Sequence, residues 1–407
     1  IRALKIIETF PEIPKENIIL GARKDMYNFD DGVNRRGTNC VKWDVPFVTE
    51  DILPMWIADM DFRVPEKVTE AIEARAAHGI FGYTGMPDSY LEAVKGWMKK
   101  HHDWEIEKEW ICHSPGVVSA LSFLIDAFTE PGDKVIVQSP VYYPFARSVR
   151  TSGRTLLDNP LIIKDGRYQM DLESLEAQLD DSVKMILLCS PHNPVGRVWS
   201  REELEALAKL CLEHHILIVS DEVHADLLFE GSKHTCFPTL SPEVEQNTIL
   251  CTGASKTFNL AGLKTSSIII PNPELREKFK TVLNRYNVGS GNIFGLVATE
   301  TAYRYGEEWL EELKKYLQGN LEYMISFMEK ELPEIPVTRP EGTYLVWMDF
   351  RSLGMCDADL EDFCRKKAKI AFDPGYEFGM GGSGYMRANI ACPRKTLETA
   401  LENLKKA

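Results

Sequence analysis

The sequence predicts an α/β protein whose large domain has a mainly parallel sheet between helices, accompanied by a smaller α/β domain. Short apolar runs alternate with stretches of helical periodicity between Asp103 and Pro271. The runs that we expect to form strands are residues 135–137, 185–188, 216–219, 248–250 and 268–270. Because strands buried on both faces are apolar throughout, this alternation indicates a mainly parallel sheet covered on both sides.

The second domain is predicted from a change of pattern after Gly295. Long charged helices over about 296–331 are followed by a strand-like run at 344–348, another helix and a glycine-rich segment at 375–384. A chain of 407 residues with 44% hydrophobic content can bury two cores. We expect three parts, namely an N-terminal segment (1–60) that joins the small domain, a large domain (61–295) and a small C-terminal domain (296–407).

The best-marked helix is predicted to begin at Ser200. The Ser200 hydroxyl can cap the helix while Glu203, three residues later, returns the contact. Leucines at 204, 207 and 210 then lie on one face of the helix, as expected for a helix packed on a sheet.

Composition argues against several classes of partner. Asp and Glu total 61 against 47 Lys and Arg, so the net charge of −14 disfavours attraction to nucleic acid or to an anionic membrane surface. No run of about 20 apolar residues is present, and residues 1–20 do not follow the order of a signal peptide. We therefore expect a cytoplasmic protein that binds neither nucleic acid nor a membrane.

The nine cysteines are scattered along the chain, without a CxxC pair or a cluster with histidine at zinc-ligand spacing. They are expected to be mostly buried thiols in a reducing compartment. No metal site is predicted.

Lys256 is the first candidate for chemistry. It stands in Thr252–Asn259, directly after the strand predicted at 248–250. Ligands of mainly parallel sheets bind beyond the carboxyl ends of the strands, and the small neighbours of this lysine leave room for a bulky molecule. Taken alone, a lysine on a loop is more often a solvated side chain.

Three further segments fall at comparable places. Asp221 follows the run 216–219 at the end of an expected strand, where a buried carboxylate is costly unless it meets a cation. Asn193 follows the run 185–188, although Asn-Pro and Gly are also common in simple turns. Gly116 precedes an expected helix, whose free N–H groups would suit a phosphate.

Together these segments resemble a known family, the fold-type I enzymes of the aspartate-aminotransferase superfamily, which use pyridoxal 5′-phosphate (PLP). Within it, four segments look like the MalY/PatB branch of cystathionine β-lyases (C–S lyases), which includes cystalysin. They are residues 54–62 (PMWIADMDF), 190–197 (SPHNPVGR), 220–224 (SDEVH) and 255–259 (SKTFN). The resemblance covers roughly residues 25–405.

The resemblance implies roles for the residues that contact the cofactor. Lys256 would be the Schiff-base lysine, Asp221 the partner of the pyridinium nitrogen, and Asn193 a donor to the ring 3-oxygen. Tyr142 matches the aromatic side chain that stacks on the ring, although an aromatic pair after a strand is more often simple packing. The phosphate would be held by the backbone of Gly116, Val117 and Val118 together with Ser255.

The resemblance also implies how substrate and partner bind. Arg387 matches the arginine that grips the α-carboxylate, a task suited to a planar bidentate donor, unless it forms a surface ion pair. Tyr143 and Trp56 are expected near the substrate, together with Asn193. Tyr83 matches a tyrosine supplied to the cofactor site by the partner subunit, which implies a homodimer with shared active sites.

Two positions depart from the aminotransferase pattern. Lys264 stands where an arginine eight residues after the Schiff-base lysine binds the phosphate, and the sequence does not define its role. His224, counted here among the cofactor contacts, replaces a tyrosine three residues after Asp221. Both departures argue against an ordinary aspartate aminotransferase, and the histidine agrees with the lyase branch.

The predicted activity is α,β-elimination from L-cystathionine or related cysteine S-conjugates, giving a thiol, pyruvate and ammonia. Transamination uses the same residues up to the loss of the Cα proton, so only the resemblance to the lyase branch separates the two. A regulatory role through a protein partner is a third hypothesis, which the intact set of Lys256, Asp221 and Arg387 makes secondary. The physiological thioether is not defined by the sequence.

Two motifs are interpreted as unrelated to the chemistry. Residues 379–384 fit the GxGxxG spacing but neither follow a strand nor open a helix near the start of a domain, so a dinucleotide site is not expected. We expect a glycine-rich loop that allows the small domain to close. The histidine pairs 101–102 and 214–215 lie near helix ends and are expected to be solvated or capping.

Overall fold

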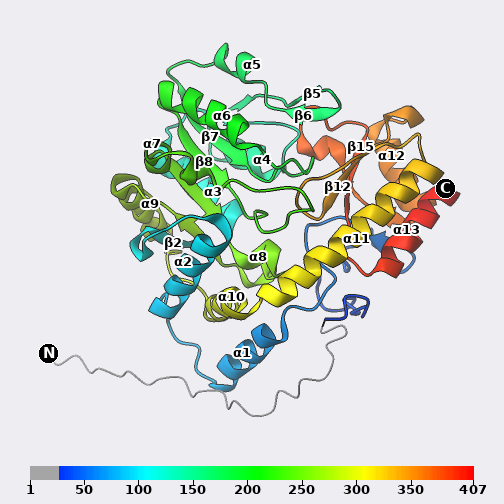
Figure 1. The fold of residues 1–407 in the computed structure, drawn as a ribbon, viewed down its shortest axis with the longest axis horizontal. Helices are drawn as coiled ribbons and strands as arrows, with labels where there is room; N and C mark the ends of the chain where they lie inside the picture. Colours follow the sequence, from blue (N-terminus) through cyan, green and yellow to red (C-terminus); the bar gives the residue numbers. More distant parts are fainter. Residues whose placement is uncertain (1–26) are drawn as a thin grey trace.

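A computed structural model of the chain describes residues 27–407, which form two α/β units built on separate sheets (Figure 1). The larger sheet has seven strands in the order β2-β10-β9-β8-β7-β3-β4. Their bounds are β2 (Ile111–Ser114), β3 (Lys134–Val137), β4 (Thr155–Asp158), β7 (Val183–Cys189), β8 (Leu217–Asp221), β9 (Thr248–Thr252) and β10 (Ser266–Ile269). Neighbours from β4 to β9 are parallel, whereas β10 is antiparallel to both β9 and β2. The mainly parallel sheet is confirmed.

Helices cover both faces of this sheet. The helices of the large unit are α1 (Glu66–Ala77), α2 (Asp88–His102), α3 (Val117–Phe128), α4 (Pro144–Thr151), α5 (Leu172–Glu176), α6 (Arg201–Glu213), α7 (Pro242–Gln246), α8 (Ala254–Thr257), α9 (Pro273–Tyr286) and α10 (Ile293–Tyr305). Within β7, Met185 and Leu187 pack in one core with α3, α4 and α9, whereas Ile186 and Leu188 pack in another with α6. This division is the physical reason that the strand is apolar from Met185 to Leu188.

The cap predicted at the start of α6 is confirmed. The Ser200 Oγ accepts from the Glu203 N–H at 3.2 Å, and the Glu203 Oε2 accepts from the Ser200 N–H at 2.8 Å. The two residues satisfy each other's free backbone donors, which fixes where the helix begins.

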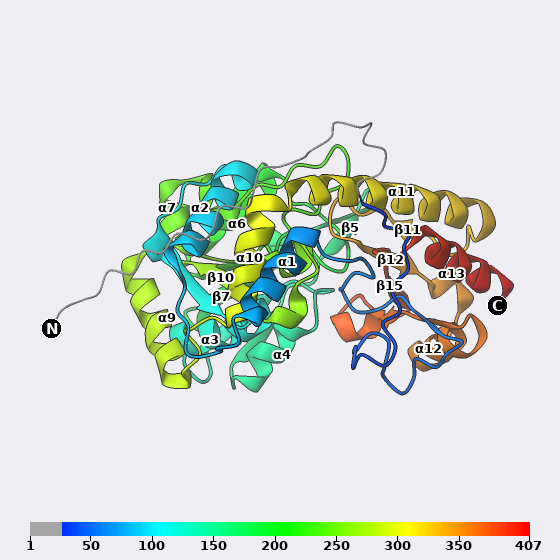
Figure 2. The same cartoon turned by 90° about the horizontal axis from the view of Figure 1, so that it is seen from below.

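The smaller sheet is antiparallel, in the order β11-β12-β15-β14. Its strands are β11 (Val337–Thr338), β12 (Leu345–Asp349), β14 (Asp373–Pro374) and β15 (Tyr385–Asn389). The helices of this unit are α11 (Glu307–Glu331), α12 (Asp357–Asp362) and α13 (Arg394–Lys406), of which α11 and α13 lie side by side (Figure 2). A hairpin of β5 (Ile162–Lys164) and β6 (Arg167–Gln169) lies outside both sheets.

The domain limits stay a prediction. Residues 1–26 of the expected N-terminal segment lie outside the described residues. The limit expected at 295 lies inside α10, and this helix packs against α1 and α2 of the large unit.

The chain before α1 links the two units. Its strand β1 (Leu53–Pro54) pairs in parallel with β13 (Ile370–Ala371) of the small unit. Seven residues on, the Met60 N–H donates to the Asn259 Oδ1 at 2.9 Å, in the large unit. Between these two anchors, Ala58 is held at the junction of the units.

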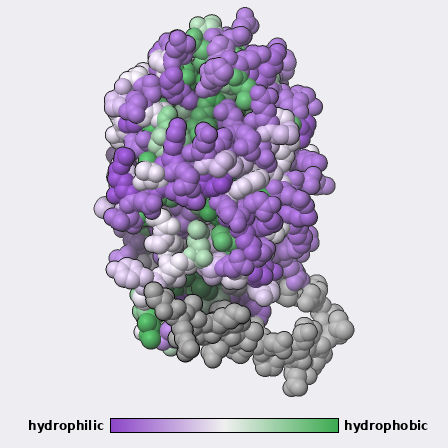
Figure 3. Space-filling view, turned by 90° about the vertical axis from the view of Figure 1, so that its left-hand side faces the viewer, coloured by the Kyte–Doolittle hydropathy of each residue, from purple (hydrophilic) through white to green (hydrophobic). Residues whose placement is uncertain are grey.

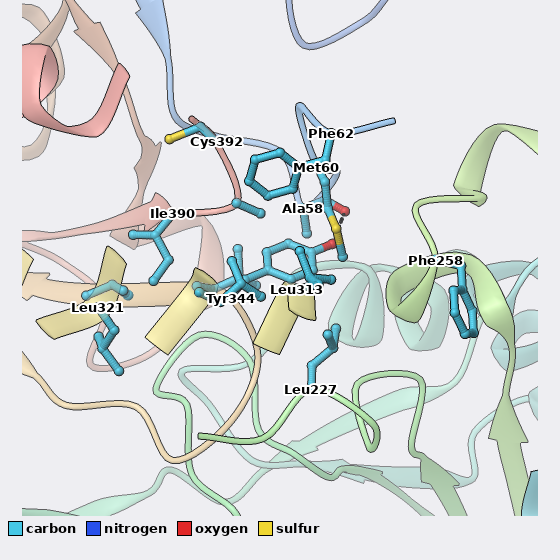
Figure 4. Close-up of a cluster of buried hydrophobic side chains, with 14 of the residues drawn as sticks. Ala58, Met60, Phe62, Leu227, Phe258, Leu313, Leu321, Tyr344, Ile390 and Cys392 are labelled. Atoms are coloured by element: carbon cyan, nitrogen blue, oxygen red, sulfur yellow. Dashed lines mark hydrogen bonds between the residues drawn. The ribbon is translucent and has the colours of Figure 1, made fainter. Parts of the chain in front are cut away.

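The largest core also lies at this junction. It includes Ala58, Phe258 after α8, Leu313 of α11 and Tyr344 before β12 (Figure 4). The Tyr344 hydroxyl donates a hydrogen bond of 2.9 Å to the Ala58 carbonyl oxygen. Apolar burial and this buried hydrogen bond together hold the two units against each other.

The surface is largely polar on the face drawn in Figure 3, as expected from the many charged residues in the sequence, with scattered apolar side chains. Among residues 27–407, no helix combines the length and the apolar character that crossing a membrane requires. Seven of the nine cysteines are buried and all nine are free, which confirms the expectation of mostly buried thiols.

Candidate functional site

A cavity of about 200 Å³ lies at one edge of the large sheet. The strands β2, β3, β7, β8 and β9 all end at this edge, so the loops that follow them converge there. Nine of the thirteen predicted site residues line the cavity, namely Gly116, Val117, Val118, Tyr142, Asn193, Asp221, His224, Ser255 and Lys256. Ala58 and Lys264 also line the cavity.

Lys256 lies in the single helical turn α8, directly after β9. Its Nζ donates a hydrogen bond of 2.6 Å to the carbonyl oxygen of Ala58. Removal from water and the nearby Arg387 guanidinium lower the pKa of Lys256 to about 8, although the carboxylates of Asp59 and Asp221 act in the opposite direction. A substantial fraction of this amine is therefore neutral near physiological pH.

Asp221 is the last residue of β8 and is buried. Burial raises its pKa to about 7, although the Val223 N–H donates to its Oδ1 at 3.2 Å. A carboxyl group in this position becomes fully ionised only when a cation lies beside it. A ring nitrogen that can carry a proton meets this requirement.

Arg387 extends from β15 of the small unit to Asn193 in the loop after β7. The Arg387 Nη1 donates to the Asn193 Oδ1 at 2.8 Å, and Nη2 forms an ion pair with Asp373. The side chain is only 2% exposed and its guanidinium lies over the Phe378 ring, so the interpretation as a surface ion pair is wrong. Its Nε has no partner among the described residues, which leaves one donor of the planar group available.

Asp373 was not found by sequence reasoning. It lies directly opposite Arg387 in the pairing of β14 with β15. The strand β14 has only two residues, too few to show a periodic pattern in the sequence.

The opposite end of the cavity is suited to an anion. Gly116, at φ 132°, precedes α3, so the first N–H groups of that helix open toward the cavity without helical partners. Ser255 and Lys264 line the same cavity. Thr265 and Ser266, which stand just before and at the start of β10, line the cavity as well.

Tyr142 and His224 line the region between the two ends. The Tyr142 N–H donates to the Asn193 carbonyl oxygen at 3.0 Å, and burial raises the pKa of its hydroxyl to about 12. Burial and the Lys256 and Arg387 cations hold the pKa of His224 well below its usual value, so the imidazole is neutral. Its Nδ1 has no partner among the described residues.

Besides Arg387, three predicted residues lie outside the cavity lining. The Tyr143 ring lies 5.1 Å from that of Tyr142 and 6.3 Å from that of Phe378, close to Arg387. Trp56 packs on Phe47, and its Nε1 donates to a backbone oxygen. Tyr83 is fully exposed in the single chain, so the structure does not bring it to the cavity of its own subunit.

The structure also shows where the glycine-rich segment and the two histidine pairs lie. The glycine-rich segment leads into β15 and not into a helix, which agrees with the interpretation that it binds no dinucleotide. His214 and His215 are exposed at the end of α6, as expected. The expectation for the other pair is wrong at His102, whose side chain is only 5% exposed and donates to Asp226 at 2.9 Å.

Comparison with known proteins gives one consistent family. The family model described as aminotransferase class I and II matches residues 50–404. Cystathionine β-lyase PatB of Bacillus subtilis is 48% identical over 93% of this chain and 99% of its own length. Protein MalY of Escherichia coli is 34% identical over 93% of this chain and 98% of its own.

Solved structures agree with these relatives. Cystalysin from Treponema denticola, which contains a pyridoxal 5′-phosphate cofactor, superposes with a TM-score of 0.91 at 38% identity, covering 94% of this chain and 98% of its own. The PLP-bound C–S lyase from Staphylococcus hominis gives 0.88 at 34% identity, covering 93% and 97%. The predicted fold-type I architecture and the resemblance to the MalY/PatB branch are thereby confirmed. The chain belongs to the aminotransferase class I and II family and, within it, to the group of PatB and MalY.

Proposed function

We propose that this protein is a PLP-dependent carbon–sulfur β-lyase that acts on L-cystathionine or related cysteine S-conjugates. The observation that carries the proposal is that Lys256, a lysine of lowered pKa, lines one cavity with the buried Asp221 and with Asn193, to which Arg387 donates a hydrogen bond. The names of the relatives, cystathionine β-lyase and C–S lyase, support the choice of reaction.

The residues present fit the phosphate and the ring nitrogen of PLP. The start of α3, Ser255 and Lys264 would hold the phosphate, which gives Lys264 the part that an arginine has in aminotransferases. Asp221 would pair with the protonated ring nitrogen, and Tyr142 would pack on the ring. When bound, PLP withdraws electrons from the Cα of an attached amino acid, which weakens its Cα–H bond.

The chain's own residues would then orient the substrate and move its proton. Arg387 would bind the α-carboxylate while Asn193 holds its guanidinium in place. The amine of Lys256, partly neutral near pH 8, would accept the Cα proton as general base. The overall reaction consumes one water and converts the S-conjugate to a thiol, pyruvate and ammonia.

A cytoplasmic homodimer belongs to the same proposal. Tyr83 is fully exposed in the single chain and lies near the exposed apolar side chains of Ile80 and Phe81. Such a group of apolar side chains is typical of a protein interface. A second subunit would cover it, and each Tyr83 would reach the phosphate end of the other subunit's cavity. A regulatory protein partner would be an addition to this assembly and not a replacement for the catalytic role.

The test is to mix the purified holoenzyme with L-cystathionine, without a 2-oxo acid, and to follow pyruvate and free thiol together. The lyase proposal requires equal, catalytic release of both products. Turnover that begins only after addition of a 2-oxo acid acceptor would identify an aminotransferase instead. The Lys256→Ala variant, prepared in parallel, controls for contaminating activity.

A further inference from the structure

A buried carboxylate, that of Asp226, lies behind the cavity and contacts none of the expected substrate groups. It accepts four hydrogen bonds from three side chains. The Trp97 Nε1 is 3.1 and 3.2 Å from the two oxygens, the His102 Nε2 is 2.9 Å from Oδ1, and the Thr257 Oγ1 is 2.7 Å from Oδ2. Two of these donors belong to α2, and the third belongs to α8.

The hydrogen bond from Thr257 to Asp226 is important because Thr257 is next to Lys256 in the chain. Thr257 is fully buried and follows Lys256 in α8, a helix of only four residues. The Lys256 amine contacts Ala58 at the cavity, whereas the Thr257 hydroxyl contacts Asp226 behind it. One backbone turn is therefore held from both sides, and a shift at Thr257 is passed directly to Lys256.

Asp226 also restrains a second segment that lines the cavity. It lies two residues after His224, and the Leu227 N–H closes the turn between them with a 3.0 Å bond to the His224 carbonyl oxygen. The same carboxylate thus fixes the loop that carries His224 and the turn that carries Lys256.

The network around Asp226 is charged. Burial disfavours charge on the His102 imidazole, but the bond to Asp226 raises its pKa above the usual value. Burial likewise opposes ionisation of Asp226, but the bond from His102 lowers its pKa below the usual value. The His101 side chain faces the same carboxylate, and Glu222 acts on His102 from the loop after β8. The Trp97 ring stacks on Tyr303 of α10 with centroids 4.8 Å apart, which holds α2 in place.

We propose that Asp226 is a positioning residue, which fixes the α8 turn through Thr257 and so sets where the Lys256 amine lies. The inference depends on the proposed role of Lys256 but not on which reaction follows. The charges around that amine are Asp59, Asp221, Arg387 and Lys264, so a small displacement changes its distance to each of them. A displaced lysine has a different pKa and a poorer geometry for proton transfer.

The chain offers a matched pair of variants. Thr257→Val removes the hydroxyl that bonds Asp226 and keeps the volume of the side chain. Thr248→Val makes the same change at the start of β9, where a buried hydroxyl donates to Val244 at 2.7 Å, at the end of the strand remote from the cavity. Thr257→Ser keeps the hydroxyl and serves as the rescue. Thr257→Ala replaces the valine variant if that one does not fold.

The readout is the pH midpoint of the visible absorption of the cofactor-loaded protein, together with kcat and KM. For Thr257→Val we expect a midpoint shift of about half a pH unit or more and a kcat about 10-fold lower at nearly unchanged KM. Thr257→Ser and Thr248→Val should keep the wild-type midpoint. If Thr257→Val loses thermal stability only, as Thr248→Val does, Asp226 has a structural role and the inference is wrong. A shifted midpoint in a protein that does not release pyruvate would uphold the inference while the lyase proposal fails.

Discussion

The guanidinium of Arg387 donates a 2.8 Å hydrogen bond to the side-chain oxygen of Asn193, across the junction between the two sheets. One residue belongs to β15 of the small unit and the other follows β7 of the large unit. The arginine that we propose to bind the substrate carboxylate is therefore oriented by a residue that is itself expected to touch the cofactor. In the proposed function, this contact would couple substrate binding to cofactor placement.

Arg387→Lys should raise KM for L-cystathionine about 30-fold, because hydrogen bonds to charged groups contribute about 2 kcal/mol. The lysine keeps the charge but loses the planar pair of donors that reaches Asn193 and the carboxylate together. Steady-state kinetics measure the effect. Arg351→Lys, an exposed arginine paired with Asp349, is the control and should leave KM unchanged. Equal KM values in both variants would contradict the role of Arg387.

Lys256→Ala should abolish the visible absorption of the bound cofactor, because no other described residue places an amine at the same point. Lys264→Gln should keep the band and weaken cofactor binding about 10-fold, since only one cation near the phosphate is lost. Absorption spectra and cofactor titration separate the two lysines. An unchanged band in Lys256→Ala would overturn the assignment of the Schiff-base lysine.

Asp221→Asn should change how the stability of the cofactor-free protein depends on pH. Burial raises the pKa of Asp221 from 3.8 to about 7, so between these values the folded state keeps a proton that the unfolded chain releases. Its contribution to the free energy of unfolding is fully present below pH 3.8 and is lost as the pH rises through 7. Denaturant unfolding at pH 5 and pH 8 should show a smaller difference in the variant, which should also bind PLP poorly.

The cofactor-free protein should incorporate PLP faster as the pH rises toward about 8, because only the neutral amine of Lys256 can react. Burial is the main cause of this lowered pKa and the Arg387 cation is the next. Arg387→Gln should therefore move the midpoint of the rate profile to higher pH. Stopped-flow absorption gives the profile, and a midpoint near the ordinary lysine value of 10.5 in the wild type would contradict the expectation.

Ser200→Ala should lower the free energy of unfolding by about 1 kcal/mol, the usual cost of losing an N-cap. The residue lies at the start of α6 and not at the cavity, so kcat should stay at the wild-type value. Thermal melting and pyruvate release measure the two quantities. A loss of activity without a loss of stability would show that α6 has a part in the chemistry.

The strand ends account for how much of the site could be predicted. Asp221, Asn193 and Lys256 each follow an apolar run, and the carboxyl ends of parallel strands meet at one edge. The order of the strands and the antiparallel direction of β10 could not be predicted from the sequence. An apolar run does not indicate which strands lie beside it or in which direction it crosses the sheet. Asp373 was missed because its contact with Arg387 depends on the register between two strands.

Buried polar contacts between distant segments were also not predictable from the sequence. His102 was expected to be solvated because it lies at a helix end among charged neighbours. Its burial results from the loop that brings Asp226 against α2, 124 residues later in the chain. Residue type and spacing in the sequence do not indicate that Asp226 contacts α2.

The hydrogen bond of the Lys256 amine goes to a main-chain oxygen, that of Ala58, which also accepts from Tyr344. Mutagenesis of each side chain in turn would not identify this acceptor, since each of the twenty amino acids has the same main-chain carbonyl group. The amino acid at position 58 can therefore change without loss of the acceptor. Its loss would require a changed backbone path, for example a deletion between β1 and Met60.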